Sequence, residues 1–207
     1  MTAPRIALVG NGAMALEYFE LFAPATFCAV FSEAAFADHN RLPLPQYTEP
    51  AVLRAVADHY VLAIGDVTDR QRLSVVMEAA GLAPCPPLLL PGAVVSPSSR
   101  VEAGSVIGHG VQVGARCHIG PHNFLMHHAV VGHDTTTGSH VLLCPGSYVA
   151  GYVRIGERVV IQAHAAVARS LSVGDDALVS QGASCFRDVP AAAIAIGNPA
   201  RLRRKDG

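Results

Sequence analysis

Residues 101–120 of the chain read VEAGSVIGHGVQVGARCHIG, with an aliphatic residue at every sixth position. The frame continues without a slip from Val95 to Cys185, and Thr137 and Cys185 are its non-aliphatic members. A six-residue repeat of this form is typical of a parallel β-helix, in which three hexads complete one triangular coil. Residues eighteen positions apart should therefore stack at about the 4.8 Å spacing of neighbouring strands. The expected inward ladder consists of Val95, Val113, Val131, Val149 and Val167.

The first part of the chain has a different pattern, in which short apolar runs alternate with helical periodicity. Strands are predicted at residues 5–9, 27–31 and 60–64, and helices up to Phe22, over 49–59 and from Thr68 onward. Strands separated by helices imply a parallel sheet with right-handed crossovers. The sequence therefore predicts two domains, an α/β domain over residues 1–92 and an all-β domain of hexapeptide repeats over residues 93–207.

The two later helices have defined apolar faces. Thr68 to Gln71 has the sequence of a capping box and is predicted to open the third helix. The expected buried face of that helix consists of Leu73, Val76, Met77 and Ala80. The expected buried face of the second helix consists of Val52, Leu53, Val56 and Ala57.

Charge and cysteine content argue against several classes of protein. Lys and Arg total 15 against 16 Asp and Glu, so neither nucleic acid nor an anionic membrane is an expected partner. The five cysteines contain no C-x-x-C pair, which argues against a disulfide framework and favours a reducing compartment. The chain has no stretch of about 18 apolar residues, and its start reads as strand, turn and helix rather than as a signal peptide. We therefore expect a cytoplasmic protein without membrane insertion.

Several short motifs narrow the interpretation beyond the repeat. They are GNGAMA at 10–15, AIGD at 63–66 followed by Arg70, VSPS at 95–98, GHD at 132–134 and GNPAR at 197–201. With these motifs the chain resembles the hexapeptide-repeat acyltransferases and, more narrowly, the bacterial sugar acetyltransferases of the PglD and NeuD type. The resemblance implies a Rossmann-like acceptor-binding domain over 1–92 and a left-handed parallel β-helix acyltransferase domain over 93–207. It also implies a homotrimer with active sites between adjacent β-helices.

The same resemblance implies a reaction and a set of site residues. Acetyl-CoA would be the cosubstrate, and the acceptor would be an amino or hydroxyl group of a nucleotide-linked, amino-deoxy sugar. The catalytic residues implied are His133 as general base, Asp134 as its acidic helper and Gly151, whose N–H faces the thioester oxygen. Coenzyme A contacts fall on Leu142, Gly151, Ala163 and Gln181. Substrate contacts fall on Gly12, Ala13, Met14, Ser32, Glu33 and Gly65.

The residues themselves fit acyl transfer. The attacking group must lose a proton, and histidine, whose ordinary pKa is about 6.5, suits that role. Gly151 lies eighteen residues after His133, so the two should stack one coil apart. Asp134 can orient His133 only if the chain turns there, because neighbouring residues of a strand face opposite sides. Without the resemblance, His133 also fits a solvated histidine at a corner of the coil.

Stacked histidines leave a second interpretation open. His109 and His127 are eighteen residues apart, as are His122 and His140, and γ-class carbonic anhydrases bind zinc on this fold with three histidines from two chains. In that class two ligand histidines lie five residues apart, and the third ligand lies 36 residues before that pair. Two histidine pairs five apart occur here, but the positions 36 residues before them hold Pro86 and Gly92 rather than histidine. We therefore expect no metal. A metal-dependent hydratase and a catalytically silent β-helix assembly module remain the alternatives.

Three further features concern the ligands. The loop over 10–15 has the form G-x-G-x-x-A, which fits a phosphate-cradling turn or a tight structural turn. The basic tail fits contacts with coenzyme A phosphates or a solvated end, and it consists of Arg201, Arg203, Arg204 and Lys205. Met14, Met126 and Leu142 are apolar where the resembling enzymes carry polar side chains. This difference favours a less polar, deoxygenated acceptor.

Overall fold

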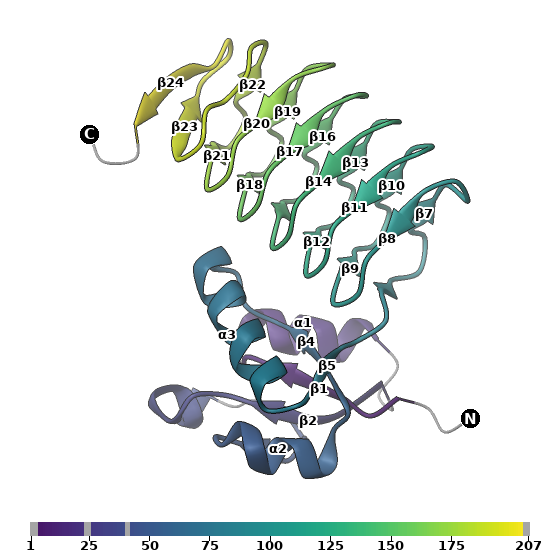
Figure 1. Ribbon diagram of the computed structural model, residues 1–207, viewed down its shortest axis with the longest axis vertical. Coiled ribbons are helices and arrows are strands. Elements are labelled where there is room, and N and C mark those ends of the chain that lie inside the picture. Colours follow the sequence, from purple (N-terminus) through teal and green to yellow (C-terminus); the bar gives the residue numbers. More distant parts are fainter. Residues whose placement is uncertain (1–3, 23–25, 40–41, 205–207) are drawn as a thin grey trace. The chain divides into compact units, whose positions relative to one another are not determined.

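The computed structural model describes residues 4–22, 26–39 and 42–204. The chain divides into two compact units, Met1–Pro86 and Pro87–Gly207 (Figure 1). The first unit alternates strands with helices, whereas the second is built of short strands joined by tight corners. The change of sequence period therefore corresponds to a change of architecture.

The first unit contains a five-stranded parallel sheet with the order β3-β2-β1-β4-β5. Its strands are β1 (Ile6–Val9), β2 (Phe27–Phe31), β3 (Gln46–Tyr47), β4 (His59–Leu62) and β5 (Ala83–Pro84). Its helices are α1 (Ala13–Leu21), the 3-10 helix η2 (Ala34–His39), α2 (Pro50–Val56) and α3 (Val67–Ala79). Strand β1 is central and pairs in parallel with β2 on one side and β4 on the other. The strand order therefore reverses at β1, and open parallel sheets bind ligands outside the carboxyl ends of the strands at such a point.

Helix α3 begins earlier than the predicted capping box. Asp66 is its N-cap, and the Asp66 Oδ1 accepts hydrogen bonds from the Thr68 and Asp69 N–H groups, each at 2.9 Å. The prediction that Thr68 opens the helix was therefore wrong. The Asp66 carboxylate already satisfies these first-turn N–H groups, because it lies just before the first helical residue.

The buried faces of the helices agree with the prediction at all but one residue. On α3, Leu73 and Met77 are buried, and the other two predicted residues pack against the same core. On α2, Leu53 is buried, but Val52 is 54% exposed, so its assignment to the core was wrong. Adjacent helical residues point about 100° apart, and Val52 lies on the side of α2 that faces solvent while Leu53 faces the core. No helix within the described residues is long and apolar enough to cross a membrane.

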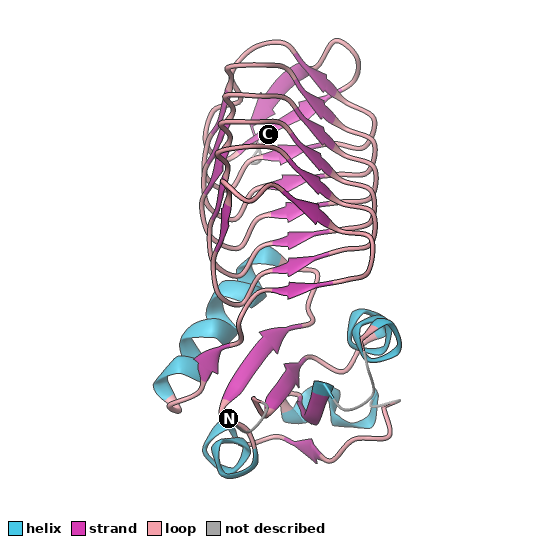
Figure 2. Cartoon of the chain, turned by 90° about the vertical axis from the view of Figure 1, so that its right-hand side faces the viewer, coloured by secondary structure: helices cyan, strands magenta, loops and turns pink. Residues whose placement is uncertain are grey.

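The second unit is a parallel β-helix with three faces, in which strands eighteen residues apart pair in parallel (Figure 2). The first face contains β7 (Val94–Val95), β10 (Gln112–Val113), β13 (Val130–Val131), β16 (Tyr148–Val149), β19 (Ala166–Val167) and β22 (Ser184–Cys185). The second face contains β8 (Arg100–Val101), β11 (His118–Ile119), β14 (Thr136–Thr137), β17 (Arg154–Ile155) and β20 (Ser172–Val173). The third face contains β6 (Leu88–Leu89), β9 (Val106–Ile107), β12 (Phe124–Leu125), β15 (Leu142–Leu143), β18 (Val160–Ile161), β21 (Leu178–Val179), β23 (Ala193–Ile196) and β24 (Arg201–Arg204).

The predicted inward ladder is confirmed. Its five valines pair in register along the first face, and the four from Val113 to Val167 are at most 3% exposed. The polar exception Thr137 is also buried, because its Oγ1 accepts hydrogen bonds from Asn123 Nδ2 at 2.6 Å and from the Gly120 N–H at 3.0 Å. The core therefore tolerates a hydroxyl group where a buried amide provides its partner.

The corners between faces have strict backbone requirements. The fourth position of the hexad is left-handed at most corners, as at Asp134 with a φ of 58°. The second position is often glycine because the coils approach closely there. A Cβ built on Gly132 would lie 2.5 Å from the Gly151 nitrogen. Such corners let adjacent residues present their side chains on the same side of the chain, which an extended strand forbids.

Candidate functional site

His133 lies at the corner that follows strand β13, where the first face turns into the second. We call residues 132–134 the His133 corner. Because the backbone turns at Asp134, the two neighbouring side chains meet, and His133 Nδ1 lies 2.6 Å from Asp134 Oδ2. The turn that the sequence required for this pair is present.

Arg116 holds the Asp134 carboxylate from the preceding coil. The Arg116 Nε donates to Oδ1 at 2.6 Å, and its Nη2 donates to Oδ2 at 2.7 Å. The hydrogen bonds from Arg116 and then from His133 lower the pKa of Asp134 to about 2. An ionised carboxylate can only accept a hydrogen bond, so the proton in the pair belongs to His133 Nδ1. The other ring nitrogen, Nε2, is therefore free to accept a proton.

Gly151 follows His133 one coil further along the β-helix. A Cβ built on Gly151 would lie 3.0 Å from His133 Nε2 and 3.1 Å from the His133 carbonyl oxygen. Only glycine therefore leaves the imidazole its present position. The backbone N–H of the next residue, Tyr152, donates to that carbonyl at 2.9 Å. Within the described chain, no backbone oxygen accepts the Gly151 N–H.

The sequence reasoning did not identify Arg116, and it also missed an aromatic and a cationic residue near the His133 corner. The Tyr152 ring meets the imidazole edge-on, with ring centres 5.0 Å apart. The Arg169 guanidinium lies over the Tyr152 ring, 4.8 Å from its centre. Tyr152 lies eighteen residues after Asp134, as Arg116 lies eighteen before it. The repeat therefore contained the signal for Tyr152 and Arg116.

The other residues predicted to contact coenzyme A lie elsewhere on the chain. Ala163 and Gln181 stack at a second corner, where the third face turns into the first, and Leu142 belongs to β15 of the third face. Gln181 is exposed, whereas Leu142 is buried. Within one chain the structure brings together His133, Asp134 and Gly151. Ala163 and Gln181 lie at the opposite edge of the first face, and Leu142 lies on the third face.

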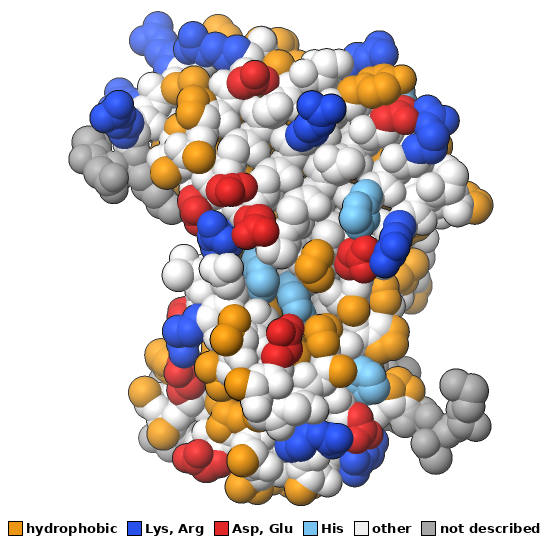
Figure 3. All heavy atoms as spheres, in the orientation of Figure 1, with side chains coloured by type: hydrophobic (Ala, Val, Ile, Leu, Met, Phe, Trp, Pro, Cys, Tyr) orange, Lys and Arg blue, Asp and Glu red, His pale blue; other side chains and the backbone are white. Residues whose placement is uncertain are grey.

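The last coils of the β-helix carry a basic groove. A cavity of about 330 Å³ is lined by Phe186, Arg187, Pro199, Ala200 and Arg201. The Phe186 ring is 68% exposed. Figure 3 shows Arg side chains gathered at this end of the β-helix, and Lys205 of the predicted basic tail lies outside the described residues. Guanidinium groups bind phosphate oxygens well, and an exposed ring can stack on a flat base.

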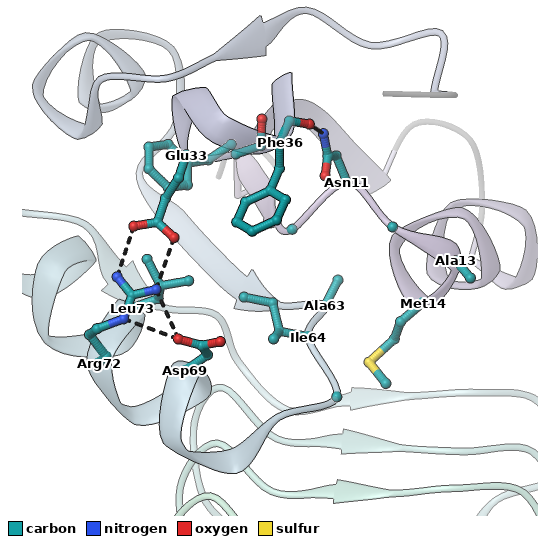
Figure 4. A pocket seen from close by; sticks show the side chains of 15 residues that line it. Asn11, Ala13, Met14, Glu33, Phe36, Ala63, Ile64, Asp69, Arg72 and Leu73 are labelled. Atoms are coloured by element: carbon teal, nitrogen blue, oxygen red, sulfur yellow. Dashed lines mark hydrogen bonds and ion pairs between the residues drawn. The ribbon is translucent and has the colours of Figure 1, made fainter. Parts of the chain in front are cut away.

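A cavity of about 310 Å³ lies at the carboxyl ends of β1, β2 and β4 in the first unit (Figure 4). All the predicted substrate contacts line it, namely Gly12, Ala13, Met14, Ser32, Glu33 and Gly65. The residues that the sequence reasoning missed include Asn11, Phe36, Ile64, Asp69, Arg72 and Leu73. The structure therefore gathers the predicted residues around one cavity at the point where the strand order reverses.

Charged side chains form one wall of this cavity. Arg72 donates to both carboxylate oxygens of Glu33, at 2.8 and 2.9 Å, and also to Asp69 Oδ1 (Figure 4). The hydrogen bonds from Arg72 lower the pKa of Glu33. Gly10 has a φ of 114°, and a Cβ there would lie 2.6 Å from the Ala63 carbonyl oxygen. Glycine at this position therefore lets the loops after β1 and β4 approach closely.

The start of α1 and a buried arginine shape the rest of the cavity. Gly12 is the N-cap of α1, and no side chain caps this helix end. Its first N–H groups therefore provide a position suited to an anion. Arg70 is fully buried and donates to the Leu62 and Ile64 carbonyl groups at 2.9 Å each, which fixes the end of β4.

The remaining histidines were the basis of the metal alternative. His122 and His140 stack as expected, with ring centres 5.0 Å apart and planes 17° apart, and both are buried. The ring that meets His109 is that of His128, edge-on at 6.2 Å. Across residues 4–22, 26–39 and 42–204, no three His, Cys, Asp or Glu side chains gather so that they could hold a metal ion.

No protein-family model matches the chain. The acyl-[acyl-carrier-protein]–UDP-N-acetylglucosamine O-acyltransferase of Pseudomonas putida is 31% identical over 111 residues. The match covers 53% of this chain and 43% of that protein, so the chain spans less than half the length of the curated relatives it matches.

Solved structures match over nearly the whole chain. The perosamine N-acetyltransferase of Caulobacter crescentus, in complex with CoA and GDP-perosamine, has a TM-score of 0.88 and is 29% identical, with 98% of each chain covered. The acetyltransferase domain of PglB from Neisseria gonorrhoeae has a TM-score of 0.84 and is 25% identical, with 97% of this chain and 100% of that chain covered. WeeI from Acinetobacter baumannii has a TM-score of 0.72 at 20% identity, which is a similarity of fold.

The β-helix and these similarities define the class of protein: the predicted resemblance to the hexapeptide-repeat acyltransferases is confirmed. Within that class, the resemblance to sugar acetyltransferases is confirmed as well, because the perosamine enzyme matches in both units. That enzyme's structure holds CoA, the carrier part of the predicted cosubstrate.

Proposed function

We propose that this protein transfers the acetyl group of acetyl-CoA to the amino group of a nucleotide-linked amino-deoxy sugar, with His133 as general base. One observation carries the proposal. The His133–Asp134 pair leaves Nε2 free beside the Gly151 backbone, on a chain similar over its whole length to an N-acetyltransferase that holds CoA and GDP-perosamine.

In the reaction His133 takes up one proton from the acceptor amine and later gives it to the CoA sulfur. His133 Nε2 takes a proton from the amine while the amine nitrogen bonds to the thioester carbonyl carbon. The carbonyl oxygen becomes an oxyanion, which the Gly151 N–H stabilises. When the intermediate collapses, the carbon–sulfur bond breaks and the imidazolium returns the proton to the CoA thiolate. Asp134 stabilises the imidazolium between these steps, because a nearby negative charge favours the protonated ring.

The CoA nucleotide would bind at the basic groove of the last coils. Arg169 and Arg187 follow Gly151 at eighteen-residue steps, so Arg187 lies three coils, or about 14 Å, beyond His133 along the β-helix. The extended pantetheine arm can span such a distance. Arg187 and Arg201 would then bind phosphate groups while Phe186 stacks on the adenine.

A homotrimer would complete the cofactor site. The His133 corner and the corner of Ala163 and Gln181 lie on opposite edges of the first face of one chain. If one copy contributes the first corner and its neighbour contributes the second, Gly151, Ala163 and Gln181 can line one groove. We therefore assign the acyl-transfer site to the interface between β-helices, and light scattering that showed a stable monomer would contradict this assignment.

The α/β unit would bind the nucleotide part of the acceptor as a Rossmann-like domain. Its cavity lies where the strand order reverses, and the start of α1 offers N–H groups for a phosphate. Met14 lines the cavity, and its apolar side chain gives the acceptor few hydrogen bonds on that side. We therefore assign acceptor binding to residues 1–92 and acetyl transfer to residues 93–207, and we expect the enzyme to prefer deoxygenated sugars.

The test is a thiol-release assay with acetyl-CoA and a panel of nucleotide-linked sugars that includes GDP-perosamine. We expect release with amino-deoxy sugars and a lower kcat/KM for otherwise identical acceptors that carry an extra ring hydroxyl. No release with any acceptor would favour the silent assembly module. Stoichiometric zinc in the purified protein together with CO2 hydration would favour the metal hydratase.

A further inference from the structure

Arg116 is joined to the His133 corner by a fork of two hydrogen bonds. Its Nε donates to Asp134 Oδ1 at 2.6 Å, and its Nη2 donates to Oδ2 at 2.7 Å. His133 Nδ1 lies 2.6 Å from the same Oδ2. One carboxylate oxygen is therefore shared by the guanidinium and the imidazole, and the other is held by the guanidinium.

The fork fixes the plane of the carboxylate. Two parallel N–H···O bonds define that plane, whereas a single hydrogen bond leaves the group free to rotate. The side chains are 64% exposed for Arg116 and 20% exposed for Asp134, so the packing around the carboxylate is incomplete. The direction in which Oδ2 presents a lone pair to His133 therefore depends on Arg116.

The backbone of the β-helix aims Arg116 at this carboxylate. Arg116 occupies the same position of the corner as Asp134, one coil earlier, and has a φ of 56°. Its N–H donates to Ser98 Oγ at 3.1 Å. The position of Arg116 is therefore determined by the coil on which it lies and by the preceding coil, which carries Ser98.

The guanidinium also carries a charge that acts on the imidazole. The negative Asp134 and the positive Arg116 both lie beside the imidazole, so removing either one changes the net charge next to the ring. The other groups that face His133 are the Tyr152 ring and, beyond it, the Arg169 guanidinium. Tyr152 also interacts with the Arg116 guanidinium, so Arg116, Asp134 and Tyr152 together surround the imidazole.

We propose that Arg116 is a positioning residue that sets both the orientation and the basicity of His133 through Asp134. This inference rests on the proposed role of His133 as general base. It assigns to Arg116 no contact with the substrates.

A double-mutant cycle of Arg116→Gln with Asp134→Asn tests the inference. Arg116→Gln should lower kcat about three- to tenfold while the KM for acetyl-CoA stays within about twofold. It should also move the acid limb of the kcat profile to higher pH, because the base then holds its proton more tightly. In the Asp134→Asn background, the same change should alter kcat by less than about twofold, because the carboxylate through which Arg116 acts on His133 is then absent. Arg116→Lys, which keeps the charge but loses the fork, should restore the acid limb without restoring all of kcat.

Arg100→Gln is the matched control. Arg100 is 75% exposed and pairs with Glu102 at 2.8 Å on the second face, so its loss should leave kcat and the pH profile unchanged. An NMR titration of the His133 ring, which needs no acceptor, should show a midpoint at higher pH in Arg116→Gln than in the wild type. An unchanged midpoint, or equal kcat losses with and without Asp134, would overturn the inference. A shifted midpoint in a protein that transfers no acetyl group would instead overturn the proposed function.

Discussion

His133 and His118 are both paired with carboxylates on the β-helix, and their side chains are 50% and 53% exposed. His133 uses Nδ1 toward Asp134, which leaves Nε2 beside the Gly151 backbone. His118 uses Nε2 toward Glu102, at 2.9 Å, and lies on a strand of the second face. The comparison shows that a histidine–carboxylate pair does not by itself create a site for chemistry. The nitrogen that stays free and the space beside it distinguish the two.

The largest difference should appear when each histidine is replaced by asparagine. His133→Asn should lower kcat about 10²–10⁴-fold, because the general base is lost. His118→Asn should leave kcat within about twofold of the wild type. Steady-state kinetics and thermal melts of both variants would check this, and the two melting temperatures should be similar because both rings are half exposed. Equal losses of kcat in the two variants would remove the distinction between the pairs.

The space beside Nε2 can be tested by filling it. Gly151→Ala introduces a methyl group 3.0 Å from Nε2, so the imidazole must turn away from its present position. We expect kcat to fall about 10- to 100-fold, because a small displacement of a catalytic group is costly. A crystal structure of the variant should show the ring displaced. A variant with normal kcat would show that the glycine is not needed by the base.

A smaller effect, on stability rather than on turnover, should come from the buried histidine stack. His140→Ala removes one ring of the stacked pair with His122, whose ring centres are 5.0 Å apart. The loss of this packing should lower the free energy of unfolding by about 1–3 kcal/mol. The kcat per folded molecule should not change. Urea denaturation alongside kinetics would check both, and a fall in kcat without loss of stability would give this stack a catalytic role.

The smallest effect concerns acid. The Asp134 pKa of about 2 lies below its ordinary value of 3.8 because of Arg116 and His133. A depressed folded-state pKa stabilises the protein above the unfolded-state value, and this contribution is lost as the pH falls through the folded-state value. The melting temperature of Asp134→Asn should therefore approach that of the wild type between about pH 4 and pH 2. Calorimetric melts across this range would check it, and a constant difference would show that ionisation is not the cause.

The β-helix could be predicted almost residue by residue because each side chain's role depends on its position in the repeat. The valine ladder and the turn at Asp134 followed from the hexad frame. Arg116 and Tyr152 did not, although both lie eighteen residues from Asp134. The frame identifies the residues that share a corner, but the bonds between their side chains depend on rotamers and on the charges of their neighbours.

The α/β unit was less predictable because its important contacts are distant in sequence. Glu33 and Arg72 are 39 residues apart and meet only because the sheet order places β2 and the start of α3 around one cavity. The prediction missed Asp66 as the N-cap of α3, because the end of β4, which sets the length of the loop before the helix, could not be located from periodicity. Met14 was identified as a cavity residue through the family resemblance, whereas the spacing of Gly10 and Gly12 had indicated only a turn that could hold a phosphate.

Each coil of the β-helix adds about 4.8 Å to its length, so the number of coils between two residues fixes the distance between them along the axis. The distance from His133 to the basic groove is therefore a whole number of coils, and Arg187 lies three coils beyond His133. An insertion of eighteen residues between Gly151 and Arg187 would lengthen this reach by one step without disturbing the corner where the proton moves. In a scaffold of this kind the number of coils can match acyl donors of different lengths, while the residues that carry out the chemistry stay at the same corner.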